Sequence, residues 1–168
     1  MVPEVENYLQ RIENLLGQIH NLVADLPAEA LNWRPIEGSE DHAMNSMAVL
    51  ATHVAGAIHF WIAEGIGRQP PTRDRDAEFV TQAGDFRELQ QRLDQAGREA
   101  REILSSLSEA ELASPRQVGE RTVPVRWALV HIIDHTALHL GHMQITYQLW
   151  RGGQSAQAPR WYERLPQD

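Results

Sequence analysis

The stretch VPVRWALVHIIDHTALHLGHMQITYQLW, residues 123–150, decides the fold of this 168-residue chain. Its apolar residues cover most of the circumference of one long helix, which Gly152 and Gly153 close. They are Trp127, Leu129, Val130, Ile132, Ile133, Leu138, Leu140, Met143, Ile145, Leu149 and Trp150. A helix that is apolar nearly all round is buried on all sides. In a small bundle its second surface would be covered by another subunit, so the pattern predicts a homodimer.

Three further segments have the spacing of helices. Apolar residues recur at three- and four-residue steps over residues 3–25 and 85–107. Residues 45–66 form a third, mostly apolar segment with Asn45 as the expected N-cap. Four helices of about 20 residues or more in one small domain predict an all-α fold, a four-helix bundle.

The connections between these helices are expected to be short or irregular. Residues 28–31 could form one turn of helix, and Ser108 with Glu111 fits a capping box that begins another. Residues 119–121 are expected to turn before the last helix. No strand-like alternation competes with the helices, although TVPVRW, residues 122–127, could be extended for a few residues. We expect residues 1–168 to form one domain, with 151–168 as a surface tail that Trp161 and Tyr162 anchor.

Composition and charge exclude several functional classes. The chain has no cysteine, which excludes disulfides, iron–sulfur clusters, thiolate zinc sites and a cysteine nucleophile. Its net charge of −8 argues against a phosphate-binding surface, so we expect no nucleic-acid partner. Charges interrupt the N-terminal MVPEVENYLQ, and the longest apolar stretches contain polar residues. We therefore expect a cytoplasmic protein with no membrane partner.

Half of the eight histidines lie in the last helix. His131, His135, His139 and His142 fall within a sector of about 80° at about 100° per residue. Imidazoles four residues apart on one helix face can bind a single metal ion, but spacing alone does not choose the ligands. The alternative is a row of hydrogen-bonded core histidines, whose burial without partners would cost free energy.

The other histidines are scattered. His53 and His59 are six residues apart, about 240° round a helix, so they cannot face the same point. His59 is expected to pack in the core or to line a pocket. His20 and His42 are expected at the surface.

Other catalytic classes fail on spacing. A ferritin-like di-iron site needs a glutamate three residues before a histidine, and no histidine here has one. The His-Glu-x-x-His motif of zincin proteases is also missing. There is no glycine-rich phosphate loop, no strand–turn–helix elbow for a serine nucleophile, and nothing specific favours haem.

Two stretches resemble a known family. Residues 31–62, LNWRPIEGSEDHAMNSMAVLATHVAGAIHFWI, have a Trp-Arg-Pro element, an Asn-Ser pair and a histidine before Trp-Ile. Residues 125–150 have two histidines four apart, followed by one residue and a glycine. Both are similar to the DinB/YfiT-like metalloenzymes, which are four-helix bundles with a three-histidine metal site. The resemblance implies His53, His135 and His139 as the ligands.

The resemblance also implies a function. Three neutral imidazoles and a water form the ligand set of an open catalytic site, and the metal lowers the pKa of a bound water or thiol. Some members of the family activate small thiols, so we expect an S-transferase, isomerase or hydrolase that uses one divalent metal, zinc or nickel. Its partners would be a small thiol or an electrophile. Two alternatives remain: a non-catalytic metal-binding or stress-response bundle that acts through its dimer surface, and a histidine face without metal.

Further residues are expected to support the site or to line its pocket. Asp134 could orient a neighbouring helix or ligand, as carboxylates commonly do for metal-binding histidines, and the alternative is a carboxylate at the helix surface. His131 and His142 would flank the ligands. The candidate pocket walls, for each of which core packing is the alternative, are His59, Trp33, Trp61 and Tyr147.

Overall fold

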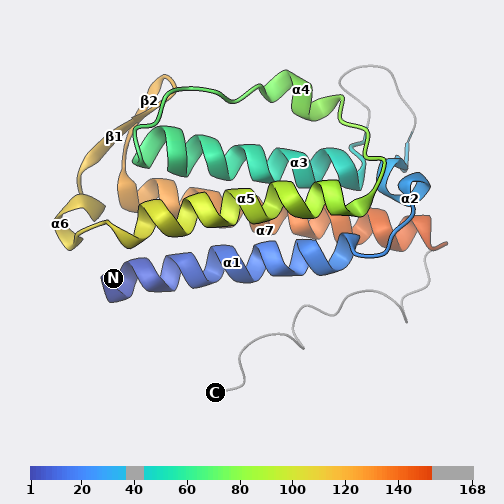
Figure 1. Ribbon diagram of the computed structural model, residues 1–168, viewed down its shortest axis with the longest axis horizontal. Helices are drawn as coiled ribbons and strands as arrows, with labels where there is room; N and C mark the ends of the chain where they lie inside the picture. The colour runs from blue at the N-terminus through green and yellow to red at the C-terminus, as the bar shows by residue number, and fades with distance from the viewer. Residues whose placement is uncertain (37–43, 153–168) are drawn as a thin grey trace.

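The computed structural model describes residues 1–36 and 44–152. Four long helical segments run side by side along the molecule (Figure 1). They are α1 (Pro3–Val23), α3 (Met47–Ile58) with its continuation η2 (His59–Ile66), α5 (Phe86–Ser105) and α7 (Val125–Trp150). The predicted four-helix bundle is confirmed.

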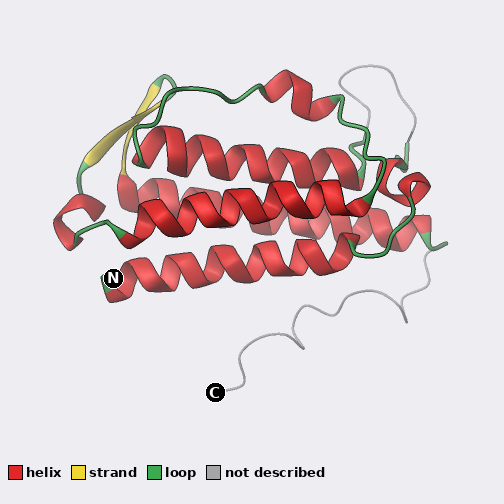
Figure 2. Ribbon diagram, in the orientation of Figure 1, coloured by secondary structure: helices red, strands yellow, loops and turns green. Residues whose placement is uncertain are grey.

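Shorter elements connect the long helices (Figure 2). They are α2 (Ala28–Asn32), α4 (Arg75–Phe79), α6 (Glu109–Leu112), and the strands β1 (Pro115–Val118) and β2 (Arg121–Pro124). The two strands form an antiparallel hairpin in which Pro115 pairs with Pro124 and Val118 with Arg121. α4 lies over α3 and brings its residues next to the bundle.

The four long helices enclose one core. α1 and α3 each pack against both α5 and α7, so α1 and α3 lie at opposite corners of the bundle. The apolar stripe of α5 is buried, whereas its arginines are exposed, as an amphipathic helix requires. The largest fully buried side chains are Leu9, Ile12, Ile19, Leu31, Met47, Ile58, Ile62, Leu89, Leu93, Leu104, Leu112 and Leu129.

Side-chain caps fix where several helices begin. The Ser46 hydroxyl accepts a hydrogen bond from the Val49 amide and caps α3, one residue after the expected Asn45. The Asp85 carboxylate caps α5 by accepting from the Arg87 amide. The capping box of Ser108 and Glu111 is present as predicted.

The π-helix η2 and the short helix α4 are features that the sequence did not indicate, and of the β-hairpin the sequence indicated only the turn and a few extended residues after it. At the end of η2 the Gly67 amide donates a hydrogen bond of 2.7 Å to the Ile62 carbonyl. This bond spans five residues, as in a π-helix, instead of the four of an α-helix. The hairpin packs on η2, where a Cβ at Gly65 would lie 2.6 Å from Val118, so the glycine makes room for the strand. The expected turn is present, and Gly119 in it has a positive φ of 57°.

One face of α7 presents apolar side chains to the outside. Trp127, Val130, Leu138, Ile145 and Leu149 are 44–57% exposed, whereas the opposite face of the helix lies in the core. The described part of the chain thus covers only one side of this apolar helix. The homodimer stays a prediction.

The segment Met47–Ile66 is long and apolar enough to cross a membrane by composition, but 78% of an apolar 18-residue stretch within it is buried inside the bundle. It is therefore the core helix of this fold. The cytoplasmic location stays a prediction. His42, Trp161 and Tyr162 lie outside the described residues.

Candidate metal centre

Three histidines from two helices meet at one point. His53 comes from α3, and His135 and His139 come from consecutive turns of α7. One nitrogen of each lies within 4.8 Å of the others, and Nε2 of His53 is 3.1 Å from Nε2 of His135. Tetrahedral zinc with bonds of about 2.0–2.1 Å to nitrogen places its ligands roughly 3.3 Å apart, so this separation fits a shared ion.

A buried carboxylate fixes the ring of His53. Glu78, from α4, accepts a hydrogen bond of 2.8 Å from Nδ1 of His53, and both side chains are almost fully buried. Because a carboxylate only accepts, Nδ1 carries the proton and Nε2 keeps its lone pair on the side of the other two histidines. A carboxylate behind a ligand histidine is the usual way to set its tautomer and orientation.

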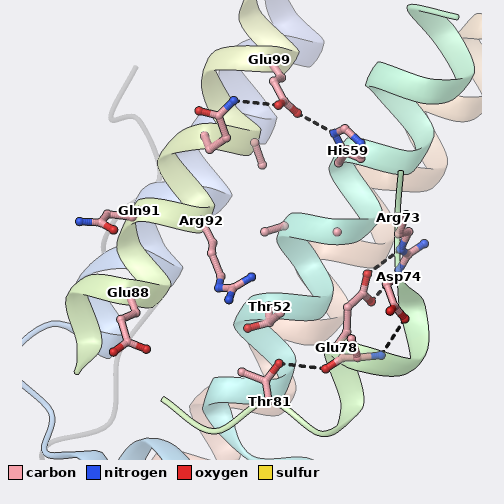
Figure 3. Close-up of a pocket in the computed structure, with 15 residues that line it drawn as sticks. Thr52, His59, Arg73, Asp74, Glu78, Thr81, Glu88, Gln91, Arg92 and Glu99 are labelled. Carbon is pink, nitrogen blue, oxygen red and sulfur yellow. Dashed lines mark hydrogen bonds and ion pairs between the residues drawn. The ribbon is translucent and has the colours of Figure 1, made fainter. Parts of the chain in front are cut away.

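Arg73 holds this carboxylate in turn (Figure 3). Its Nε donates to Oε1 of Glu78 at 2.6 Å and its Nη2 donates to Oε2 at 2.9 Å. Burial favours the protonated acid, but the hydrogen bonds from Arg73 and His53 outweigh it, and the pKa of Glu78 lies below its usual value. The carboxylate therefore stays charged and remains an acceptor at neutral pH.

A glycine makes room for Glu78 against α3. A Cβ at Gly56 would overlap Oε1 of Glu78 and lie 2.7 Å from its Cδ, so only glycine lets the carboxylate lie on the helix. His53 and Gly56 are three residues apart on α3, which places the ligand and this space on neighbouring turns.

The two histidines of α7 are available as neutral ligands. Burial, followed by the charges of neighbouring histidines, lowers the pKa of His135 to about 3 and that of His139 to about 4. Both rings are neutral at pH 7, as metal binding requires. Their Nδ1 atoms are buried and have no hydrogen-bond partner in residues 1–36 and 44–152. Binding to a metal would offset part of the cost of burying these rings.

Comparison with known proteins shows the family of the chain. A family model described as the DinB superfamily matches residues 11–143, which is most of the chain. The chain belongs to the DinB superfamily.

Two solved structures share the fold of this DinB protein. A conserved protein from Enterococcus faecalis has a TM-score of 0.68 at 16% identity, over 88% of this chain and 96% of that one. A DinB-like protein from Bacillus cereus ATCC 10987 has a TM-score of 0.67 at 17% identity, over 88% and 92% of the two chains. At these identities the likeness shows the fold alone. No curated protein matches the chain.

Two of the expected flanking residues border the centre of this DinB protein. The ring of His131 stacks on Trp127 at 5.1 Å and contacts Trp61 at 4.5 Å, and it lies 6.1 Å from the ring of His135. His142 is exposed, with its ring 5.6 Å from that of His139. Trp61 and His131 thus form an aromatic wall at one end of the histidine row.

Of the two alternatives for Asp134, the structure shows the surface carboxylate and not the orienting group. Its carboxylate is exposed on α7, and within the described ranges it has no hydrogen bond to a ligand histidine. Asp134 lies about 100° round the helix from His135, so the two side chains leave α7 in different directions. The carboxylate that orients a ligand is Glu78 instead.

The remaining candidates lie away from the three ligands. Trp33 follows α2, and Tyr147 packs beside Trp150 near the end of α7. Neither has a ring contact with the three histidines in the part of the chain that the structure describes. His20 is partly exposed and bonds to Gln90, as expected of a surface residue.

His59 belongs to a second cluster, which anchors Arg73. Nδ1 of His59 donates to Glu99 of α5 at 2.8 Å, and its Nε2 lies 2.9 Å from the Thr72 hydroxyl. Oε1 of Glu64 accepts from the Thr72 and Arg73 amides at 2.5 and 2.8 Å. The π-helix η2 supplies both His59 and Glu64, so it fixes the segment from which Arg73 reaches Glu78.

Proposed function

We propose that this protein is a metal-dependent enzyme that binds one divalent ion, zinc or nickel, through His53, His135 and His139. Its reaction would activate a small thiol or water, as in an S-transferase, an isomerase or a hydrolase. The observation behind this proposal is the convergence of three imidazoles in a group that includes no fourth protein ligand from residues 1–36 and 44–152. Three protein ligands and an open position are typical of catalytic rather than structural sites.

The chain itself would supply orientation and shielding. A bound divalent ion lowers the pKa of a water or thiol, so that either is a nucleophile near neutral pH. Glu78 and Arg73 keep Nε2 of His53 directed at the site, and the wall of Trp61 and His131 shields one side of His135 from water. Because the chain has no cysteine, a thiol substrate would be a separate small molecule.

The metal-loaded protein is expected to accelerate one of two model reactions. In the first, a small thiol displaces chloride from chlorodinitrobenzene, and the released chloride and proton complete the balance. In the second, water cleaves nitrophenyl acetate to nitrophenol and acetate. The measurement is the rate for zinc- or nickel-loaded protein beside metal-free protein and His135→Ala, with a panel of small thiols in the first assay. Equal rates in all three samples would count against an enzyme.

The alternative is a non-catalytic metal-binding or stress-response bundle that acts through a subunit surface. Metal binding without turnover in either assay would favour it. The exposed apolar face of α7 is the specific observation on its side, since contiguous exposed apolar residues mark interaction surfaces.

We also propose that this face of α7 joins two copies of the chain. Asp134 is the single charged residue among the exposed residues of this face. Two copies of the face can therefore meet without rows of like charges lying opposite each other. Light scattering after size exclusion is expected to give twice the mass of one chain for the wild-type protein. The Leu138→Glu variant is expected to have the mass of a single chain. Val80→Glu, at a 75% exposed position that ends α4, is the matched control and should leave the dimer intact. A monomeric wild-type protein would contradict the proposal.

A further inference from the structure

A second feature of the molecule is a cavity of about 760 Å³ between α3, α4 and α5 (Figure 3). None of the three histidines lines it, although Arg73 and Glu78 form part of its wall. Its volume lies in the range of small-molecule sites, roughly 300–1,000 Å³. Small residues from all three helices leave this space open: Ala55, Gly56, Ala77 and Ala96.

The wall includes a buried polar group without a partner. Thr52 of α3 is 6% exposed, and its hydroxyl has no hydrogen-bond partner within the described residues. In Figure 3 this hydroxyl points from α3 into the space that faces α5. A buried hydroxyl without a partner is costly, so a ligand that accepts its hydrogen bond would be favoured.

A cation faces the same space. Arg92 of α5 extends towards α3 in Figure 3 and has no ion pair or hydrogen bond in the described part of the chain. Glu88 lies one turn before it, at the spacing that ordinarily forms an ion pair on a helix, yet the two are not paired there. The other charged groups of the wall already have partners: Arg73 with Glu78, His59 with Glu99, and Asp74 with the Ala77 amide.

We propose that this cavity binds a small organic carboxylate, with its carboxylate on Arg92 and Thr52 and its apolar body against the alanines. A guanidinium binds a carboxylate through two parallel N–H donors, and a hydroxyl can add a third. Several wall carboxylates would repel a doubly charged anion such as phosphate, which favours a single negative charge on an apolar body. The proposal needs no metal and is independent of the proposed reaction.

The test is a calorimetric titration of the full-length protein with hexanoate, once metal-free and once loaded with zinc. Hexanamide has nearly the same shape without the charge, and inorganic phosphate has charge without the apolar body. Hexanoate is expected to bind about tenfold or more tightly than hexanamide or phosphate. Hexanamide cannot form the charge-assisted hydrogen bonds, and phosphate lacks the apolar body that contacts the alanines. Equal binding of hexanamide or phosphate would overturn the proposal.

Matched variants locate the site. Arg92→Gln is expected to weaken hexanoate binding about tenfold or more, whereas Arg98→Gln should leave it unchanged. Arg98 lies on the same helix but bonds to Gln95 and does not line the cavity. Thr52→Val should also weaken binding while the unfolding temperature is maintained or raised, since it removes an unpaired buried hydroxyl. Similar binding by the Arg92 and Arg98 variants would place hexanoate elsewhere.

Discussion

His135→Ala and His139→Ala are each expected to abolish one-to-one binding of zinc or nickel. Each variant leaves only two of the three imidazoles that meet between α3 and α7. Loss of a direct ligand should exceed the roughly 10- to 100-fold cost of losing a group that only supports one. The measurement is elemental analysis of untagged protein after dialysis, with wild type and both variants side by side.

His142→Ala is the control for these variants. Its ring lies 5.6 Å from that of His139, but it is exposed and outside the group of three. It should retain close to one metal per chain. Circular dichroism of the metal-free proteins separates loss of the ligand from loss of the fold. A wild-type protein that takes up neither zinc nor nickel would reject the metal centre.

The long helices could be predicted because each has a periodic signal that its own residues carry. The stripe of α5 and the nearly continuous apolar surface of α7 indicate burial without reference to any partner. The spacing of the histidines on the last helix indicates a row that can bind a metal, but only the family resemblance selected His135 and His139 from that row. Bringing His53 to them depends on how α3 packs on α7, and only the family resemblance supplied that.

The support behind His53 could not be predicted in the same way. Glu78 lies 25 residues after His53, on a helix of five residues that is too short for a periodic pattern. Arg73 precedes that helix, in a connection whose course depends on Glu64 in the π-helix. The extra residue in a π-helical turn has no recognisable sequence pattern, so His59 was predicted to lie on a regular helix. The role of η2 in fixing the segment of Arg73 was therefore not predicted.

Gly56→Ala is expected to weaken metal binding about 10- to 100-fold while the fold is retained. A Cβ at this position overlaps the carboxylate of Glu78, and α3 cannot move because its other face lies in the core. The carboxylate must therefore shift, and its hydrogen bond to Nδ1 of His53 is lost with it. The measurement is the zinc dissociation constant from competition with a chelating dye, together with the unfolding temperature of the metal-free protein.

Gly17→Ala separates this effect from the general gain of replacing glycine in a helix. Nothing lies within 4 Å of a Cβ at Gly17 in α1, so that variant should gain up to about 1 kcal/mol of stability and bind metal as wild type does. Glu78→Gln removes the charge without touching α3 and should match Gly56→Ala in metal affinity. If both changes act through the same hydrogen bond, the double variant should lose little more than either single one. Additive losses would instead mean that Gly56 acts on the site by another route than the carboxylate behind His53.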